Sequence, residues 1–298
     1  MMPLYVSAYD TEAVYPWWES DASGFDYTPN RIREFLAGVR AVADVHLEQD
    51  VPATFFLVAR MVELAGRELR AILDHSLFDI QCHSFTHPDL MALDDRGDAD
   101  ALRYELADSK KLIEDTFGTP VTGLTAPGGY TRGFAGHPRI LGLMQEAGYR
   151  YVRSVGAGPA HTVPAPFNGP FWYTEDGFPD LLETPSHAWH DNILTGQPAR
   201  THWPPVLPWS LPATVPGDAR GVYDAYAPGI DYCLQTDFPY YLPIFHPWSI
   251  YRIDRKAGQI ALLVEHARQN MEMAHCGHLL GHIRSNRTLA RERPLLVP

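Results

Sequence analysis

Short apolar runs alternate with longer stretches of helical periodicity along the first half of the chain. Each short run is rich in β-branched or aromatic residues and is bounded by turn residues, which is typical of buried strands. The strands predicted in this way cover 4–9, 51–58, 77–80, 121–125 and 149–154. Between them, apolar residues recur three or four positions apart, which predicts helices at 31–49, 60–73, 98–117 and 137–147. This alternation predicts right-handed crossovers and a parallel sheet or barrel.

The second half of the chain begins with a stretch whose composition and hydrophobic pattern differ from those of the first half. Residues 156–216 are rich in proline and tryptophan and lack a clear period, with one strand-like piece at 181–185. A long irregular insertion in a compact domain usually serves function, so we expect a lid or pocket wall there. The elements expected after it are a partly helical segment at 219–237, a strand at 240–245, a helix at 258–273 and a weakly patterned tail. No repeat or low-complexity tract is visible, and a chain of this length suits one α/β barrel as well as two domains.

Acidic residues and histidines, which can act in catalysis or bind a metal ion, follow four of the predicted strands. They are Asp10 with Glu12, His83 with His87, His190 with Asp191, and His246. In a parallel barrel the carboxyl ends of all strands open on one face. These residues can therefore converge although the sequence separates them widely.

His83 and His87 are the strongest of these signals. They are four positions apart, on the loop or first helical turn that follows the strand at 77–80. Two residues at this spacing share one face of a helix, and neutral imidazoles are common ligands of zinc-like ions. The pair can hold two corners of a metal site, and a third, anionic ligand must come from elsewhere in the chain.

Composition and charge limit which classes of binding partner and which cellular location we expect for the protein. The 298 residues carry a formal net charge of -12, which argues against binding to nucleic acid and to anionic membranes. The N-terminus lacks the pattern of an export signal and no long apolar span occurs, so we expect a cytoplasmic protein. The odd set of Cys82, Cys233 and Cys276 is best interpreted as packed thiols.

In their order along the chain, five motifs resemble those of the polysaccharide deacetylase family, also called the NodB-homology family or carbohydrate esterase family 4. The motifs are Tyr9-Asp10-Thr11-Glu12, His83-Ser84-Phe85-Thr86-His87-Pro88, Thr125-Ala126-Pro127-Gly128-Gly129-Tyr130, Trp189-His190-Asp191 and Phe245-His246-Pro247. The resemblance implies an α/β fold with a deformed (β/α)7-type barrel, as a single catalytic domain over 1–298.

The resemblance also implies a divalent metal ion, with His83 and His87 as ligands. Zinc is expected, and cobalt, nickel or iron would suit the same mixed ligands. The first motif leaves two interpretations open. If its acids are spaced by one residue, Asp10 is the general base and Glu12 is the third ligand. If the family's commoner Asp-Asp pair applies, Asp10 is the base and Thr11 stands where a ligand has been lost.

The third motif departs from the family at Thr125, where an arginine normally braces the catalytic carboxylate. A neighbouring cation lowers the pKa of a carboxyl group by about 1 to 3 pH units, so its loss changes the tuning of the base. Arg132 and Arg139, which follow this motif, are the candidates to replace it.

The remaining motifs imply the other roles. His246 would protonate the leaving amine, and Asp191 would keep it cationic. The residues implied in substrate binding are Gly128, Gly129, Tyr130 and Trp189.

The implied function is metal-dependent removal of an acetyl group from an N-acetylated carbohydrate or small molecule. The oligomeric state is not predicted. Two alternatives stay open: an allantoinase-type hydrolase of cyclic imides or ureides with the same fold, and a catalytically inactive carbohydrate-binding relative.

Overall fold

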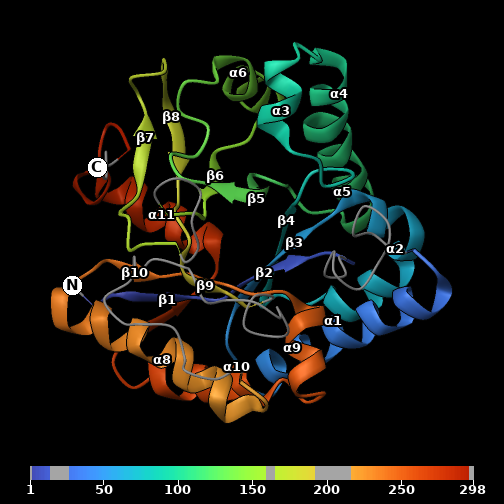
Figure 1. Ribbon diagram of the computed structural model, residues 1–298, viewed down its shortest axis with the longest axis vertical. Helices are drawn as coiled ribbons and strands as arrows, with labels where there is room; N and C mark the ends of the chain where they lie inside the picture. Colours follow the sequence, from blue (N-terminus) through green and yellow to red (C-terminus); the bar gives the residue numbers. More distant parts are fainter. Residues whose placement is uncertain (1, 14–26, 159–164, 192–215, 295–298) are drawn as a thin grey trace.

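The computed structural model describes residues 2–13, 27–158, 165–191 and 216–294 (Figure 1). Its centre is a seven-stranded sheet with the strand order β2-β3-β4-β5-β6-β8-β7. The strands are β2 (Ala8–Thr11), β3 (Ala53–Leu57), β4 (Phe78–Cys82), β5 (Gly123–Tyr130), β6 (Tyr151–Val155), β8 (Phe178–Glu183) and β7 (Phe171–Tyr173). Neighbours pair in parallel except β7 with β8, which are antiparallel.

Two further strands close this sheet into a barrel: β9 (His187–His190) and β11 (Pro243–Ile244). They pair in parallel with each other. On one side the Ser186 backbone N–H, just before β9, donates to Val155 O on β6 at 2.8 Å. On the other, the Asp10 N–H on β2 donates to Phe245 O at 2.9 Å, directly after β11. The prediction of an α/β, deformed barrel is confirmed by this closed arrangement.

Helices surround the barrel (Figure 1). The longer ones are α1 (Pro29–Gln49), α2 (Ala59–Leu73), α5 (Ser109–Phe117), α6 (Pro138–Ala147), α8 (Ala219–Thr236), α10 (Gly258–Ala267) and α11 (Cys276–Ser285). The shorter ones are α3 (Leu90–Asp95), α4 (Ala99–Arg103) and α9 (Pro247–Ile253). Helix α1 packs on α9 and α2, and α8 packs on α10. The single helix expected at 98–117 consists of α4 and α5 joined by a π-helical turn, Tyr104–Asp108.

The expected strands at 4–9 and 240–245 each divide between two sheets. The first half of each lies in a three-stranded sheet with the order β10-β1-β12. Its strands are β1 (Leu4–Val6), β10 (Tyr240–Tyr241) and β12 (Glu272–Ala274). The second halves, β2 and β11, belong to the barrel. A pattern of apolar residues could not show these breaks, because both halves are buried throughout.

Three predictions for the second half need correction. The segment at 219–237 is helical over nearly its whole length as α8, despite Pro228 inside it. The helix expected at 258–273 ends at Ala267 and is followed by β12. The tail that looked weakly patterned contains α11, which buries Leu279 and Ile283 against the sheets. In each case packing against the rest of the fold decides the structure.

The described part of the stretch 156–216 contains β7, β8 and β9. The predicted lid would also involve 159–164 and 192–215, which lie outside the described residues. Among the helices that are described, none has the length and apolar character needed to cross a membrane.

Candidate active site

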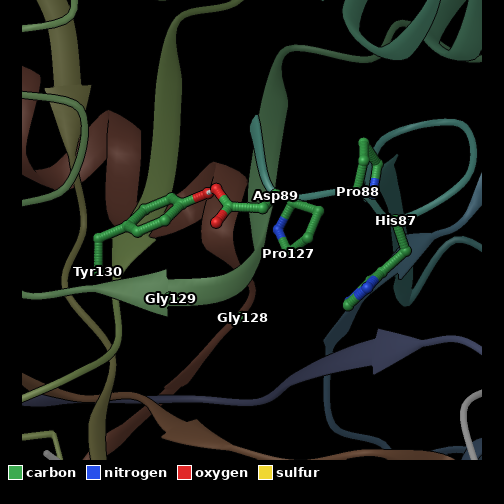
Figure 2. Close-up of a pocket in the computed structure, with 7 residues that line it drawn as sticks. All are labelled: His87, Pro88, Asp89, Pro127, Gly128, Gly129 and Tyr130. Carbon is green, nitrogen blue, oxygen red and sulfur yellow. Dashed lines mark hydrogen bonds between the residues drawn. The ribbon is translucent and has the colours of Figure 1, made fainter. Parts of the chain in front are cut away.

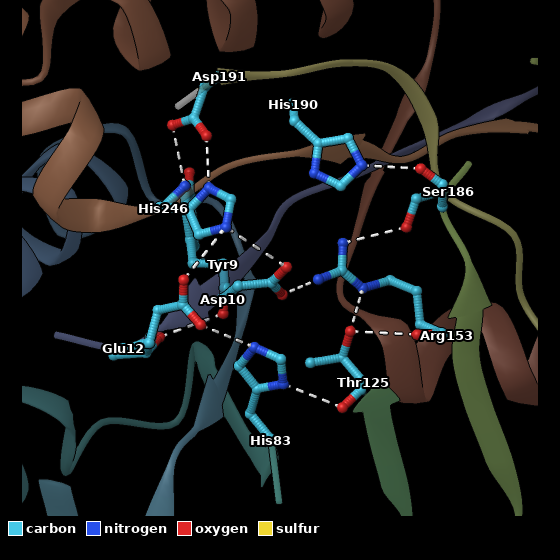
Figure 3. Close-up of polar contacts among 12 residues, drawn as sticks. Tyr9, Asp10, Glu12, His83, Thr125, Arg153, Ser186, His190, Asp191 and His246 are labelled. Atoms are coloured by element: carbon cyan, nitrogen blue, oxygen red, sulfur yellow. Dashed lines mark hydrogen bonds and ion pairs between the residues drawn. The ribbon is translucent and has the colours of Figure 1, made fainter. Parts of the chain in front are cut away.

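Polar side chains from four strand ends meet at one end of the barrel (Figure 3). Asp10 and Glu12 come from the end of β2, and His83 follows β4. Asp191 follows β9, and His246 follows β11. All five side chains are buried, with at most 7% of any residue exposed. The topology thus brings together residues that the sequence separates by more than two hundred positions.

Glu12 lies against both histidines of the second motif. Its Oε2 atom is 3.1 Å from His83 Nε2 and 2.8 Å from His87 Nε2. One ligand atom of each residue lies within 4.8 Å of the others. Thr11 is not part of this group, because its hydroxyl donates to the Tyr9 carbonyl oxygen at 3.1 Å. The geometry therefore matches the interpretation in which the two acids are spaced by one residue.

The hydrogen bonds of His83 test whether these residues suit a cation. His83 Nδ1 lies 3.0 Å from the Thr125 carbonyl oxygen, which can only accept a hydrogen bond. A neutral His83 therefore carries its proton on Nδ1 and turns the lone pair of Nε2 toward the Glu12 carboxylate. Two lone pairs at this distance need positive charge between them, either a proton or a metal ion. Metal-binding histidines are commonly oriented by such a hydrogen bond from the ring nitrogen that does not bind the metal to a backbone carbonyl oxygen.

A tight turn, rather than a helix, brings the two histidines together. They precede the first residue of α3, and Ser84 and His87 both have positive φ, 59° and 62°. Of the two placements that the sequence left open, a loop or a first helical turn, the structure has the loop, and the two histidines lie together on it. Glu105 supports the turn, because its Oε2 accepts from the Phe85 and Thr86 backbone N–H groups at 2.8 Å each. Glu105 belongs to the π-helical turn, a feature frequent near functional sites.

His246 and Asp191 form a buried pair beside this group. His246 Nδ1 donates to Asp191 Oδ1 at 2.5 Å, and the His246 backbone N–H donates to Oδ2 at 3.0 Å. The other ring nitrogen, Nε2, faces the acids, at 3.5 Å from Glu12 Oε1 and 3.9 Å from Asp10 Oδ2. Burial lowers the pKa of His246, but Asp191 and then Glu12 raise it, and the pKa ends above its ordinary value.

Two neighbouring groups have pKa values shifted the other way. Burial raises the pKa of Glu12, but the nearby imidazoles of His87 and His83 outweigh this and hold it well below its usual range. Burial lowers the pKa of His190 to about 4. His190 is therefore neutral near pH 7 and donates from Nε2 to the Gly156 carbonyl oxygen at 2.7 Å.

Arg153 on β6 forms an ion pair with Asp10 Oδ1. The same guanidinium donates from Nε to Thr125 Oγ1 at 3.0 Å and from Nη1 to Ser186 Oγ at 3.1 Å (Figure 3). It lies over the Phe56 ring, with Cζ 5.2 Å from the ring centroid. Burial lowers the pKa of Arg153 to about 10, so the side chain is still cationic near neutral pH.

This arginine replaces the two that the sequence suggested. Arg139 instead pairs with Asp94 on the outside of the barrel, at 3.0 Å, and Arg132 is exposed. Arg153 stands opposite Thr125 in the β5–β6 register. The sequence carried a signal for it, since an arginine inside a buried strand needs a partner. That signal does not say which carboxylate is the partner.

A cavity of about 430 Å³ borders His87. The residues that line it are His87, Pro88, Asp89, Pro127, Gly128, Gly129 and Tyr130 (Figure 2). Three of the four residues expected to contact the substrate are therefore at this cavity. Trp189 is the exception: it does not line the cavity and is 1% exposed within the core. The Trp189 ring therefore does not contribute to this cavity, and its role in substrate binding stays a prediction.

The sequence matches one family model, and the fold is similar to that of solved structures. The family model for polysaccharide deacetylase matches residues 22–152. No curated protein matches the sequence. Among solved structures, one assigned to the polysaccharide deacetylases from Mycobacterium smegmatis has a TM-score of 0.66 at 15% identity, covering 100% of this chain and 94% of that one.

Two further structures share the fold at similarly low identity. A protein from Pseudomonas aeruginosa PAO1 assigned to the same family has a TM-score of 0.63 at 12% identity, covering 95% of this chain and 91% of its own. Puue allantoinase has a TM-score of 0.63 at 14% identity, covering 95% and 90%. The match over residues 22–152 confirms the resemblance to the polysaccharide deacetylase family that the order of the motifs indicates.

Proposed function

We propose that this protein is a metal-dependent amide hydrolase that removes an acetyl group from an N-acetylated sugar, glycan or small metabolite. The observation that carries the proposal is the convergence of Glu12, His83 and His87 beside Asp10 and His246. The match to the polysaccharide deacetylase family supports hydrolytic deacetylation as the reaction class.

Glu12, His83 and His87 would hold the metal ion. A bound divalent cation of the zinc type lowers the pKa of water and polarises an acyl carbonyl group. The mixed set of two imidazoles and one carboxylate suits zinc, and also cobalt, nickel or iron.

Asp10 is placed to act as the general base. Its Oδ1 is held by Arg153, and its Oδ2 faces His246 Nε2 across 3.9 Å. The carboxylate therefore has a fixed orientation toward the space between the metal-binding residues and His246, where a water molecule can lose its proton to it.

His246 is placed to act as the general acid. Asp191 holds its Nδ1, which leaves the proton on Nε2 directed at the site. Because the pKa of His246 is raised, the imidazolium form persists to higher pH and can protonate the leaving amine. The backbone at Gly128 and Gly129 lines the adjoining cavity, so an amide there is the candidate donor to the oxyanion that develops during attack.

Two observations favour this proposal over a catalytically inactive carbohydrate-binding protein. That alternative treats Thr11 and Thr125 as losses from the site. Glu12 lies beside the histidines where Thr11 does not, and Arg153 supplies the cation missing at Thr125. The metal-binding set also distinguishes the proposal from an allantoinase-type reaction without the usual metal site.

The test combines metal analysis with acetate release from a panel of N-acetylated sugars and small amides. His83→Ala should remove both the bound metal and the turnover. His278→Ala, at a partly exposed histidine on α11, is the matched control and should keep both. Turnover by His83→Ala in metal-stripped buffer would refute the metal dependence, and a metal-free, inactive wild type would favour the binding protein.

A further inference from the structure

The cavity beside His87 contains one carboxylate. Among the described residues that line it, Asp89 is the only acidic one, and the others are a histidine, two prolines, two glycines and a tyrosine. Figure 2 shows the Asp89 carboxylate between the Tyr130 hydroxyl and the Pro127 ring. Tyr130 donates to Asp89 Oδ1 at 3.1 Å, so the tyrosine holds the carboxylate in one orientation.

The bonds of Asp89 leave part of it available to a ligand. Oδ1 also accepts from the Ala92 backbone N–H at 3.1 Å, at the start of α3. Within the part of the chain that the structure describes, no hydrogen bond reaches Oδ2. An ionised carboxylate accepts hydrogen bonds and cannot donate them. The free oxygen therefore suits a donor on the ligand, and an ammonium group best of all.

In the described ranges, no lysine or arginine lines the cavity to balance this charge. Arg153, the cation closest to the catalytic acids, is buried and already paired with Asp10. The protein as a whole carries a formal net charge of -12. A ligand with a carboxylate would meet repulsion from Asp89, whereas a cationic ligand would meet attraction.

We propose that this cavity binds a positively charged group, so that the substrate is an N-acetylated amine that carries a second, free ammonium. Asp89 is the residue that sets this specificity. The inference rests on the proposed function, because the cavity borders one of the proposed metal-binding histidines. A partly deacetylated amino sugar oligomer and an acetylated diamine both present this chemistry.

Binding and turnover are measured separately, so that the two proposals can fail independently. Dissociation constants are determined by calorimetry for three ligands of matched length: acetylated diaminobutane, N-butylacetamide and acetamidobutanoate. Acetate release is recorded for the same compounds, and for chitobiose carrying one or two acetyl groups, which distinguishes a sugar from an alkyl amine. The wild type should bind the cation about two- to fivefold more tightly than the neutral amide, as for an exposed ion pair. It should bind the anion most weakly.

Asp89→Asn removes the charge but keeps the helix cap, because asparagine caps a helix as well as aspartate does. The preference for the cation over the neutral amide should disappear in this variant. Asp98→Asn is the matched control: Asp98 caps α4 through the same bond, with Ala101 N at 3.1 Å, and does not line the cavity. Asp98→Asn should keep the preference.

Equal binding of cation and neutral amide by the wild type would overturn the inference. Retention of the preference in Asp89→Asn would also overturn it, because Asp89 would then act only as a helix cap. Absence of acetate release from every compound, with the binding preference intact, would instead contradict the proposed function and leave the charge selectivity standing.

Discussion

The ion pair between Arg153 and Asp10 offers the sharpest test of how this site is built. Arg153→Met keeps most of the length of the side chain but removes the charge and the donors. It leaves Asp10, which is 7% exposed, without its cation, and it removes the hydrogen bonds that the guanidinium donates to Thr125 and Ser186. Breaking a buried ion pair by removing one partner costs about 3 to 5 kcal/mol. We expect a loss of this size in the free energy of unfolding.

A double-mutant cycle separates the ion pair from the rest of the arginine's contacts. Asp10→Asn and Arg153→Met are measured alone and together by urea unfolding. Because the double variant leaves no uncompensated charge, its destabilisation should be smaller than the sum of the two single effects by at least about 1 kcal/mol. Arg153→Lys keeps a charge without the planar fork and should fall between the wild type and Arg153→Met.

The Arg153 variants also report on Asp10 as the proposed general base. A neighbouring cation favours the ionised carboxylate, so its removal should move the acid limb of the pH–rate profile to higher pH. Metal content should stay unchanged, because Asp10 and Arg153 are outside the proposed ligand set. Additive effects on unfolding, together with an unmoved acid limb, would refute the assignment of Arg153 to the catalytic carboxylate.

Three further changes test the surrounding structure. Asp191→Asn removes the charge that raises the pKa of His246, so the alkaline limb of kcat should move to lower pH, because the general acid must be protonated. Glu105→Ala should weaken metal affinity by about 10- to 100-fold in a zinc titration, since it leaves the histidine turn unsupported, whereas Glu105→Gln keeps an acceptor and should lose less. Gly129→Ala should lower Tm more than Gly118→Ala does: both have positive φ, but only at Gly129 would a Cβ meet backbone, 2.9 Å away.

The periodic pattern predicted the barrel better than it predicted the final third of the chain. The strands at 51–58, 77–80 and 121–125 and their intervening helices are local signals, and the structure has them as β3, β4 and β5 with α2, α4 and α5. The breaks in the strands at 4–9 and 240–245 are not encoded by local sequence signals. They depend on which strand lies alongside, and a continuously buried run gives no sign of a change of partner.

The candidate site likewise has features that the local sequence predicted and features that depend on distant residues. The spacing of residues within each motif indicated Glu12, His83 and His87. The parallel direction of the predicted strands indicated that these residues could meet at one end of the barrel. The sequence left open whether the pair lies on a loop or on a helical turn, and Glu105 together with two residues of positive φ decides for the loop. The support comes from a segment about twenty residues away, and spacing within the motif does not contain it.

Thr125 explains why the arginine could be on a neighbouring strand. Its hydroxyl accepts from Arg153 Nε and donates to the Arg153 carbonyl oxygen at 3.1 Å, while its own carbonyl oxygen accepts from His83 Nδ1. A threonine is small enough to leave space for a guanidinium that enters from β6, whereas an arginine at 125 would occupy that space itself. The charge beside Asp10 is therefore fixed by the β5–β6 register and not by the residue type within the third motif. Thr125, which looked like the loss of a functional residue, orients both a proposed metal ligand and the cation that holds the proposed base.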